Sequence, residues 1–409
     1  MQRKHGAFRK IRAARRLGYD GKMFSQRTNW KLHANRFTEA QREVTAEGRE
    51  TLDLTLSNPT RAGLRYHDTA ILNALSNTCA LEYDPQPKGL FRARCAIADY
   101  YREKNCSVDP DALVLTTSTS EGYSFVFRLL ANPADEILVP RPSYPLFEFL
   151  ADLQDVKLVP YTLIYDHGWQ IDFPSLRSAV SERTRALVVV HPNNPTGSYV
   201  SEAEKTLLNE FCRDRPIALI ADEVFLDYSL DSVQRESFAS NRGALTLTLS
   251  GLSKISALPQ MKVAWIVTSG PERETAAAIE RLEVIADTYL SMNAPLQLAI
   301  PVLLEQRRTV QPELIERAKR NLAELNSQLA LRPECQQLDV QGGWYAVLRV
   351  PAVQSDEELA IRILRESSVL VHPGHFYDLP SDGYLVVSLI TPEAQFKEGV
   401  RRIMRTMSA

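Results

Sequence analysis

The middle of the chain alternates short apolar runs with helical stretches, and this alternation restricts the fold more than any other feature. The runs lie at 112–117, 136–140, 156–161, 186–192, 217–225, 245–250 and 261–267. Several are apolar throughout, which is typical of strands covered on both faces. A helical pattern, EAEKTLLNEFCRD (202–214), separates two of them. The sequence therefore predicts an α/β fold, a mostly parallel sheet of about seven strands with helices on both faces.

A smaller α+β unit is expected toward the C-terminus. A long helical region near 271–330 precedes it, with breaks expected at Pro295, Pro301 and Pro312. A strand-like run at 344–350 and a helix near 355–367 follow. Residues before about 65 precede the first strand of the sheet, so we expect them to join this unit. The expected parts are a basic tail at 1–22, an N-terminal segment at 23–65, a large domain at 66–295 and a C-terminal small domain at 296–409.

Composition excludes several classes of function. Hydrophobic residues make up 44% and charged residues 24% of the 409 residues, the ordinary balance of a globular protein. The formal net charge is −2, so no global charge favours nucleic acid or a membrane surface. No apolar run approaches the roughly 18–20 residues that span a bilayer. The five cysteines form no CxxC or Cys/His cluster, so we expect no disulfide framework and no metal site, and a reducing cytoplasm fits.

Residues 1–22 differ from the rest of the chain, with eight Lys or Arg and one acid, Asp20. They contain no apolar core segment, which excludes a signal peptide. A transit peptide remains open, although the segment has no serine or threonine. The composition favours a disordered tail, or an upstream start with Met23 as the natural initiator.

Polar residues follow the apolar strands, at the edge where open parallel sheets bind ligands. STSEG (118–122) follows the first strand and should open a helix. Its hydroxyl and backbone N–H groups could form a phosphate cradle, or Ser118 or Thr119 could simply cap the helix. HPNNPTG (191–197) follows the fourth strand, and Asn194 either directs its amide into the cleft or belongs to an ordinary Asn-Pro turn.

Two charged residues end the next two strands. Asp222 lies in ADEVF (221–225), where an acid can serve as a metal ligand, a cap or the partner of a cofactor. Lys254 lies 32 residues further along, in SGLSK. A lysine among small residues is either a solvated loop charge or an amine that forms a Schiff base.

The ordered set of motifs resembles the class I/II aminotransferases, a fold type I family of pyridoxal-phosphate enzymes. The resemblance runs from about Ser57 to the C-terminus. Besides STSEG, HPNNPTG, ADEVF and SGLSK, the motifs are SNPT (57–60), YDPQPKGL (83–90), PSYP (142–145) and QGGWY (341–345). The resemblance implies the fold type I architecture, pyridoxal 5'-phosphate as cofactor, amino acid and 2-oxo acid substrates, and a homodimer with shared active sites.

The resemblance also implies roles for individual residues. Lys254 matches the lysine that holds the cofactor as a Schiff base and then moves the substrate Cα proton. Asp222 matches the carboxylate that pairs with the pyridine nitrogen and keeps it protonated. Asn194 matches the residue that bonds the ring hydroxyl, and Tyr144 the aromatic that stacks on the ring. The phosphate is assigned to Ser118, Thr119, Ser120 and Lys262, and to Tyr83 from the neighbouring subunit.

Three positions depart from the family pattern. Residue 225 is Phe where a tyrosine often bonds the ring hydroxyl, and residue 251 is Gly where a phosphate-binding serine is usual. The family's last strand usually carries an arginine that binds the substrate α-carboxylate, and here that position is Val386, in YLVVSLI. Arg61 is the first replacement candidate, although it could equally be a surface arginine. His372 and His375 are weaker candidates, because a histidine near a turn is more often structural.

The resemblance thus implies a pyridoxal-phosphate-dependent aminotransferase, a transferase of amino acid metabolism. A lyase, decarboxylase or synthase on the same fold is the alternative, because fold does not fix function. A binding protein on a degenerate scaffold is a third reading. It fits less well, because Lys254, Asp222 and Asn194 are all retained and residues 1–22 are too short for a DNA-binding domain.

Overall fold

The architecture is known from a computed structural model that describes residues 23–30, 33–145, 147–290 and 292–408. Over these residues the central sheet has eight strands, in the order β2-β9-β8-β7-β6-β3-β4-β5. They are β2 (Leu113–Thr116), β3 (Glu136–Arg141), β4 (Lys157–Tyr165), β5 (Trp169–Ile171), β6 (Thr184–Val190), β7 (Ala218–Asp222), β8 (Thr246–Gly251) and β9 (Ala264–Ser269). Seven correspond to the predicted runs. The eighth, β5, has three residues and returns antiparallel along β4 after a tight turn, too short to give a periodic pattern.

The pairing confirms a mostly parallel α/β sheet. β4, β3, β6, β7 and β8 are parallel to one another, while β9 runs antiparallel between β8 and β2. The parallel strands end at one edge of the sheet. Because Asp222 ends β7 and Lys254 follows β8, adjacent strands bring their side chains together at this edge.

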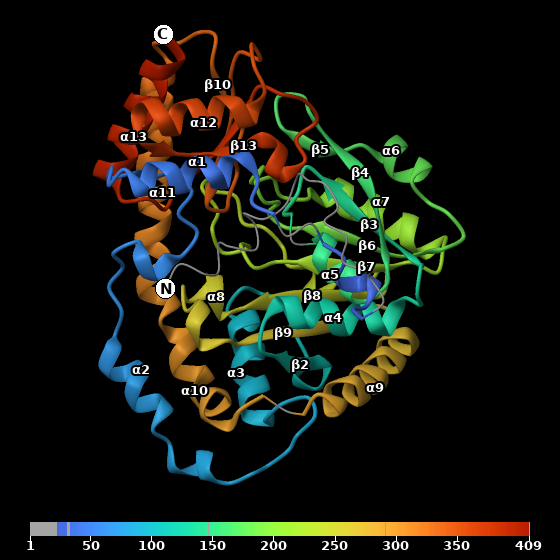
Figure 1. Ribbon diagram of the computed structural model, residues 1–409. Coiled ribbons are helices and arrows are strands. Elements are labelled where there is room, and N and C mark those ends of the chain that lie inside the picture. The colour runs from blue at the N-terminus through green and yellow to red at the C-terminus, as the bar shows by residue number, and fades with distance from the viewer. Residues whose placement is uncertain (1–22, 31–32, 146, 291, 409) are drawn as a thin grey trace.

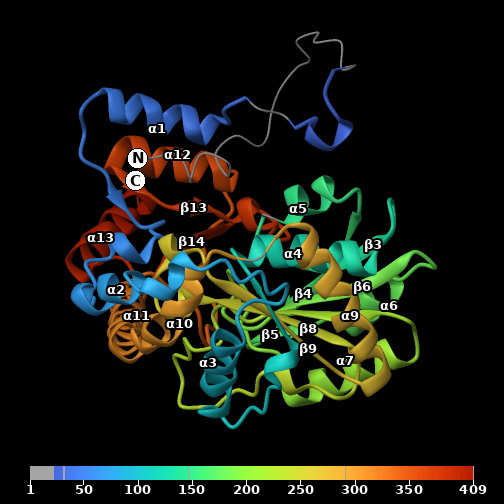
Figure 2. The same cartoon turned by 90° about the horizontal axis from the view of Figure 1, so that it is seen from below.

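Helices cover both faces of the sheet, which explains why its strands are apolar throughout (Figure 2). One face is covered by α4 (Thr119–Leu130), α5 (Phe147–Leu153) and α9 (Glu272–Thr288). The other face is covered by α3 (Phe91–Arg102), α6 (Phe173–Ser178), α7 (Glu202–Arg213) and α10 (Ala294–Glu305).

The helical region after the sheet is interrupted just before Pro295, as predicted, because Pro295 lies in the first turn of α10, but it is not interrupted at the other two prolines. Pro301 lies inside α10 and Pro312 inside α11 (Arg307–Leu329), so the prediction of breaks at these prolines is wrong. A proline removes one helical hydrogen bond, and the buried apolar face of α10 outweighs that loss. The break at Pro295 lies before Asn293, whose side chain caps α10, and a second break, which was not predicted, lies at Gln306. The expected domain boundary at 295/296 therefore falls inside α10.

A second, antiparallel sheet forms the smaller unit at the top of Figure 1. Its order is β10-β11-β14-β13. The strands are β10 (Gln336–Gln337), β11 (Tyr345–Arg349), β13 (His372–Pro373) and β14 (Tyr384–Ser388), and the helices around them are α1 (Arg36–Ala46), α11, α12 (Asp356–Ser367) and α13 (Glu393–Ser408). Residues near both ends of the chain meet here. α1 lies beside α12 in both views, and β1 (Leu52–Asp53) pairs with β12 (Val369–Leu370).

Short helices connect these elements. They are α2 (Asp68–Leu75), α8 (Leu252–Ile255), η2 (Gln26–Thr28), η3 (Pro59–Arg61), η4 (Thr78–Leu81), η5 (Pro110–Ala112), η6 (Phe238–Ser240), η7 (Pro259–Met261) and η8 (Gly374–Tyr377). Among the described residues, no helix combines the length and apolar character needed to cross a bilayer. The basic tail expected at 1–22 lies outside the described residues.

Candidate active site

Asp222 is a half-buried carboxylate that accepts two hydrogen bonds. Its Oδ2 accepts a hydrogen bond from Tyr123 Oη at 2.9 Å, and its Oδ1 accepts one from the Val224 amide at 3.2 Å. Burial raises the pKa of Asp222, while these two donors and the positive charge of Lys254 act in the opposite direction. A desolvated anion of this kind is stabilised by a further cationic partner.

Lys254 lies in α8, directly after β8. Its Nζ is 4.5 Å from the ring centroid of Trp344 and 5.1 Å from that of Phe225. Burial of the ammonium group lowers the pKa of Lys254 to about 8, although the charge of Asp222 raises it. A substantial fraction of the amine is therefore neutral near physiological pH, the form that attacks a carbonyl carbon.

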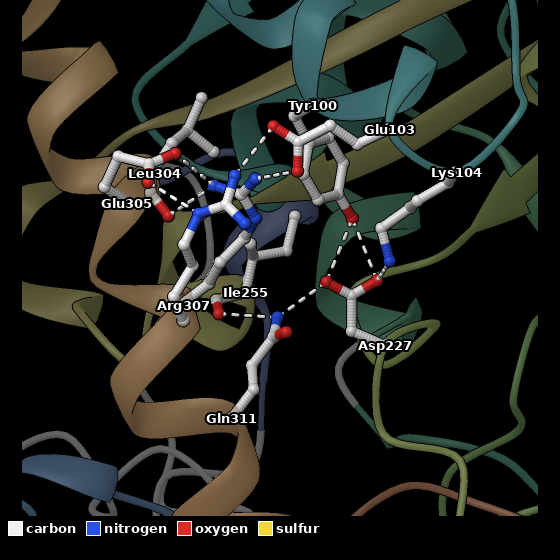
Figure 3. A network of polar contacts seen from close by, with 10 residues as sticks. Tyr100, Glu103, Lys104, Asp227, Ile255, Leu304, Glu305, Arg307 and Gln311 are labelled. Carbon is white, nitrogen blue, oxygen red and sulfur yellow. Dashed lines mark hydrogen bonds and ion pairs between the residues drawn. The ribbon is translucent and has the colours of Figure 1, made fainter.

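A polar network reaches the backbone of Ile255, the residue after Lys254 (Figure 3). Gln311 Nε2 donates to the carbonyl of Ile255 at 2.8 Å and to Asp227 Oδ2 at 2.6 Å. Asp227 also accepts from Tyr100 Oη at 3.0 Å and forms an ion pair with Lys104. Sequence reasoning missed this network. The one available signal was Asp227, an acid five residues after Asp222 that remains 2% exposed.

The structure shows STSEG as the N-terminus of a helix capped by Ser118. Ser118 is the N-cap of α4 and accepts from the Glu121 amide at 3.2 Å. Glu121 in turn accepts from the Thr117 amide at 2.6 Å. Thr119 and Ser120 form the start of the helix, where backbone N–H groups lack helical partners and favour an anion.

Gly251 explains one departure from the family pattern. A Cβ at this position would lie 2.8 Å from both the Val263 carbonyl oxygen and the Ala264 Cβ, because β8 runs against β9 here. A serine would therefore require the backbone to shift.

Lys262, which was assigned to the phosphate, is exposed and adopts a left-handed conformation at the end of η7. The next residue, Val263, accepts a hydrogen bond from the Leu252 amide through its carbonyl oxygen.

Asn194 and Tyr144 lie at the same edge. Asn194 is 8% exposed, and its Oδ1 makes no hydrogen bond to any described residue. A buried acceptor without a donor costs about 1–3 kcal/mol, so a ligand that offers an O–H or N–H group would recover this energy. Burial, and to a lesser degree the charge of Asp222, raise the pKa of the Tyr144 phenol.

Val386 occupies the expected position of the carboxylate-binding arginine and cannot replace it. Its side chain is fully buried in β14, between Val347 on β11 and His372 on β13. It belongs to the same apolar cluster as Phe225 and Trp344, which places it on the site-facing side of the small sheet.

Three replacement candidates were predicted. Arg61 is exposed in η3, and its side chain forms no hydrogen bond or ion pair with the described residues. The segment before it runs along the end of β14, since Ser388 Oγ donates to the Leu56 carbonyl at 2.5 Å. His372 Nδ1 lies 2.9 Å from Tyr377 Oη, while His375 packs against a neighbouring aromatic ring.

Tyr83 is separated from these residues. It lies between η4 and α3 and is 76% exposed.

The arrangement of polar residues at the edge of the large sheet agrees with the protein family that the sequence matches. Residues 66–403 match the family described as "Aminotransferase class I and II". The chain belongs to this family. The prediction of a transaminase on the fold type I architecture is thereby confirmed, and the family uses pyridoxal 5'-phosphate.

Individual relatives of this aminotransferase agree. The "Glutamate-pyruvate aminotransferase AlaA" of Haemophilus influenzae is 28% identical, and the alignment covers 88% of this chain and 92% of the relative. The "Alanine aminotransferase" of Mycobacterium tuberculosis is also 28% identical, over 83% of this chain and 81% of the relative. A crystal structure of an aminotransferase from Escherichia coli superposes with a TM-score of 0.80 at 26% identity, covering 92% of this chain and 95% of that one.

The residues of this aminotransferase fit the family's cofactor. A protonated pyridine nitrogen is a cationic partner for Asp222, and a ring hydroxyl is a donor for the Asn194 oxygen. The α4 N-terminus suits a phosphate group. The lowered pKa of Lys254 suits an amine that forms a Schiff base.

Proposed function

We propose that this aminotransferase binds pyridoxal 5'-phosphate covalently through Lys254 and moves an amino group between an amino acid and a 2-oxo acid. The observation that carries the proposal is the pair of Asp222 and Lys254 at the ends of adjacent strands. Desolvation raises the pKa of the half-buried carboxylate, which favours a cationic partner, and the amine is partly neutral at physiological pH.

Each residue of the site has one task in this proposal. Pyridoxal phosphate supplies an aldehyde carbon that amines attack and a protonated ring that withdraws electrons from the substrate Cα. Lys254, once displaced by the substrate amine, would take the proton from the substrate Cα and deliver it to the carbon that the cofactor's aldehyde supplies. Asp222 holds the proton on the pyridine nitrogen. Ser118, Thr119, Ser120 and Lys262 bind the phosphate, Asn194 bonds the ring hydroxyl and Tyr144 covers the ring face.

The proposal includes a homodimer. The segment from α2 to α3 exposes large apolar side chains to solvent, with Leu72 63%, Leu81 91% and Tyr83 76% exposed. A contiguous exposed apolar patch is a common mark of a protein interface. A second copy of the chain would cover this segment, and Tyr83 would reach the phosphate of the neighbouring site. A cytoplasmic location remains part of the proposal and rests on the cysteine content alone.

The substrates follow from the relatives, whose names specify alanine, glutamate and pyruvate. We propose a small amino acid or glutamate as donor and the corresponding 2-oxo acids as acceptors. The test mixes the purified holoenzyme with single amino acids and follows the visible absorbance of the cofactor. Productive donors should convert the cofactor to its amine form, and a 2-oxo acid should restore it. Release of free ammonia instead of this reversible exchange would indicate a lyase.

Arg61 is proposed to bind the substrate carboxylate in place of the missing arginine. Hydrogen bonds to charged groups contribute about 1.5–3 kcal/mol, so Arg61→Ala should raise KM for the best amino acid by roughly 10- to 150-fold. Cofactor occupancy should change little. Arg65→Ala, which removes another exposed arginine of the same segment, is the control and should leave KM unchanged.

A second variant tests whether an arginine at the usual family position can replace Arg61. Val386→Arg would return a guanidinium to the site-facing strand and should partly restore KM when combined with Arg61→Ala. An unchanged KM in Arg61→Ala would eliminate Arg61. The carboxylate would then be bound by another cation, or the substrate would have no free α-carboxylate.

A further inference from the structure

Lys254 is enclosed by two aromatic rings that come from different parts of the chain. Phe225 follows β7 in the large sheet, whereas Trp344 precedes β11 in the small sheet. The two rings pack edge to face at 5.1 Å between centroids, and Lys254 Nζ lies over both. Both side chains are at most 4% exposed, so water does not compete at these ring faces.

Hydrogen bonding does not explain why residue 344 is a tryptophan. Its Nε1 is buried and has no partner among the described residues. An unsatisfied N–H disfavours a tryptophan where phenylalanine or leucine would fill similar space. What tryptophan offers beyond these residues is its ring face, which binds cations better than that of phenylalanine or tyrosine. The ring face is turned toward an amine, 4.5 Å away.

We propose that Trp344, with Phe225, is a positioning residue that binds the ammonium form of Lys254 at the moment when Lys254 has taken the substrate proton. In that step the Cα–H bond breaks, a new N–H bond forms on Nζ, and the electron pair stays with the substrate carbon and its conjugated partner. The amine gains a full positive charge within a largely apolar enclosure. Two ring faces stabilise this charge without forming a hydrogen bond that would have to break when the proton moves on.

Three other groups near Lys254, on Asp222, Tyr228 and Tyr66, are engaged in other contacts. Asp222 is the charged group whose field acts on the ammonium, and its carboxylate is already bonded to Tyr123 and Val224. Tyr228 and Tyr66 donate to the carbonyls of Lys254 and Ala257 at 2.6 and 2.8 Å, so they hold the backbone rather than the amine. Burial keeps both phenols neutral by raising their pKa.

The proposal rests on the proposed function for its catalytic meaning, yet it can be tested on the cofactor-free enzyme. Trace acetic anhydride would label the enzyme at a series of pH values, and mass spectrometry would quantify label on the Lys254 peptide. The midpoint of labelling gives the pKa of Lys254. A desolvated cation–π contact corresponds to roughly one pKa unit or more, so Trp344→Leu should lower the pKa of about 8 by about one unit. Trp344→Phe should lower it by less.

The matched control is Phe238→Leu. Phe238 belongs to the same apolar cluster but lies over Lys205 instead of Lys254, so its loss should leave the pKa of Lys254 unchanged. Phe225→Leu is the second test variant, needed where Trp344→Leu reduces folding, and it should also lower the pKa. An unchanged or raised pKa in the folded Trp344 and Phe225 variants would overturn the proposal.

A second measurement separates this inference from the proposed function. Borohydride reduction of the Trp344→Phe holoenzyme should still fix the cofactor on Lys254. Label on Lys254 together with an unchanged Lys254 pKa would refute the aromatic role alone, whereas label on another lysine would refute the proposed function.

Discussion

Asp222→Ala is expected to fold and retain part of its cofactor, yet to lose at least two orders of magnitude in kcat. Removing one electrostatic partner of the charge that develops in a transition state costs roughly 10²–10³-fold in rate, or about 2.7–4 kcal/mol. Without the carboxylate, the pyridine nitrogen would lose its proton and the ring would withdraw electrons poorly. Steady-state kinetics on the best donor, together with cofactor content by absorbance, would measure both effects.

Asp222→Asn is the matched control for shape. The amide preserves the size of the side chain, and its oxygen can still accept from Tyr123 or Val224, but it carries no charge. Its kcat should therefore fall nearly as far as in Asp222→Ala, with less loss of thermal stability. Turnover close to that of the natural protein in either variant would refute the assignment of Asp222.

Lys254→Ala should have the largest effect on activity. A positioned base contributes roughly 10²–10⁴-fold, and this variant also loses the covalent attachment, so we expect kcat to fall by at least 10³-fold. A small primary amine such as methylamine should restore part of the rate, because it can enter the space of the side chain and accept the proton. Rate constants with and without the amine, measured at several pH values, would test this.

Lys262→Ala is the control for this experiment. Lys262 is an exposed lysine eight residues further along, assigned to the phosphate. Its loss should weaken cofactor affinity while covalent capture and proton transfer persist, and methylamine should not change its rate. Rescue by methylamine in Lys262→Ala, or its absence in Lys254→Ala, would contradict the roles assigned to the two lysines.

The sequence predicted those parts of the molecule that depend on local pattern. Apolar runs identified seven strands of the central sheet, and the polar residues after them fell at one edge because parallel strands end together. β5 was missed because three residues carry no period. Pro301 and Pro312 were misjudged as helix breaks, because burial of apolar side chains offsets one lost hydrogen bond and that burial is a property of the folded chain.

The parts that could not be predicted depend on contacts between distant segments. Gln311, on α11, donates to the carbonyl of Ile255, and the spacing of these two residues in the sequence does not predict the contact. The same holds for Trp344, which belongs to a motif noted for its position in the family and which the fold brings against Lys254. For Val386 the sequence was informative, because its departure from the family pattern could be seen there. The structure adds that the Val386 side chain packs in the same apolar cluster as Trp344.

The central claim is that Lys254 holds the cofactor, and one measurement tests it directly. The holoenzyme is reduced with borohydride, digested and analysed by mass spectrometry for the peptide that carries the reduced cofactor. The account predicts a yellow protein whose visible absorbance disappears on reduction, with the label on a single peptide at Lys254. Label on a different lysine, or no covalently bound cofactor at all, would contradict it.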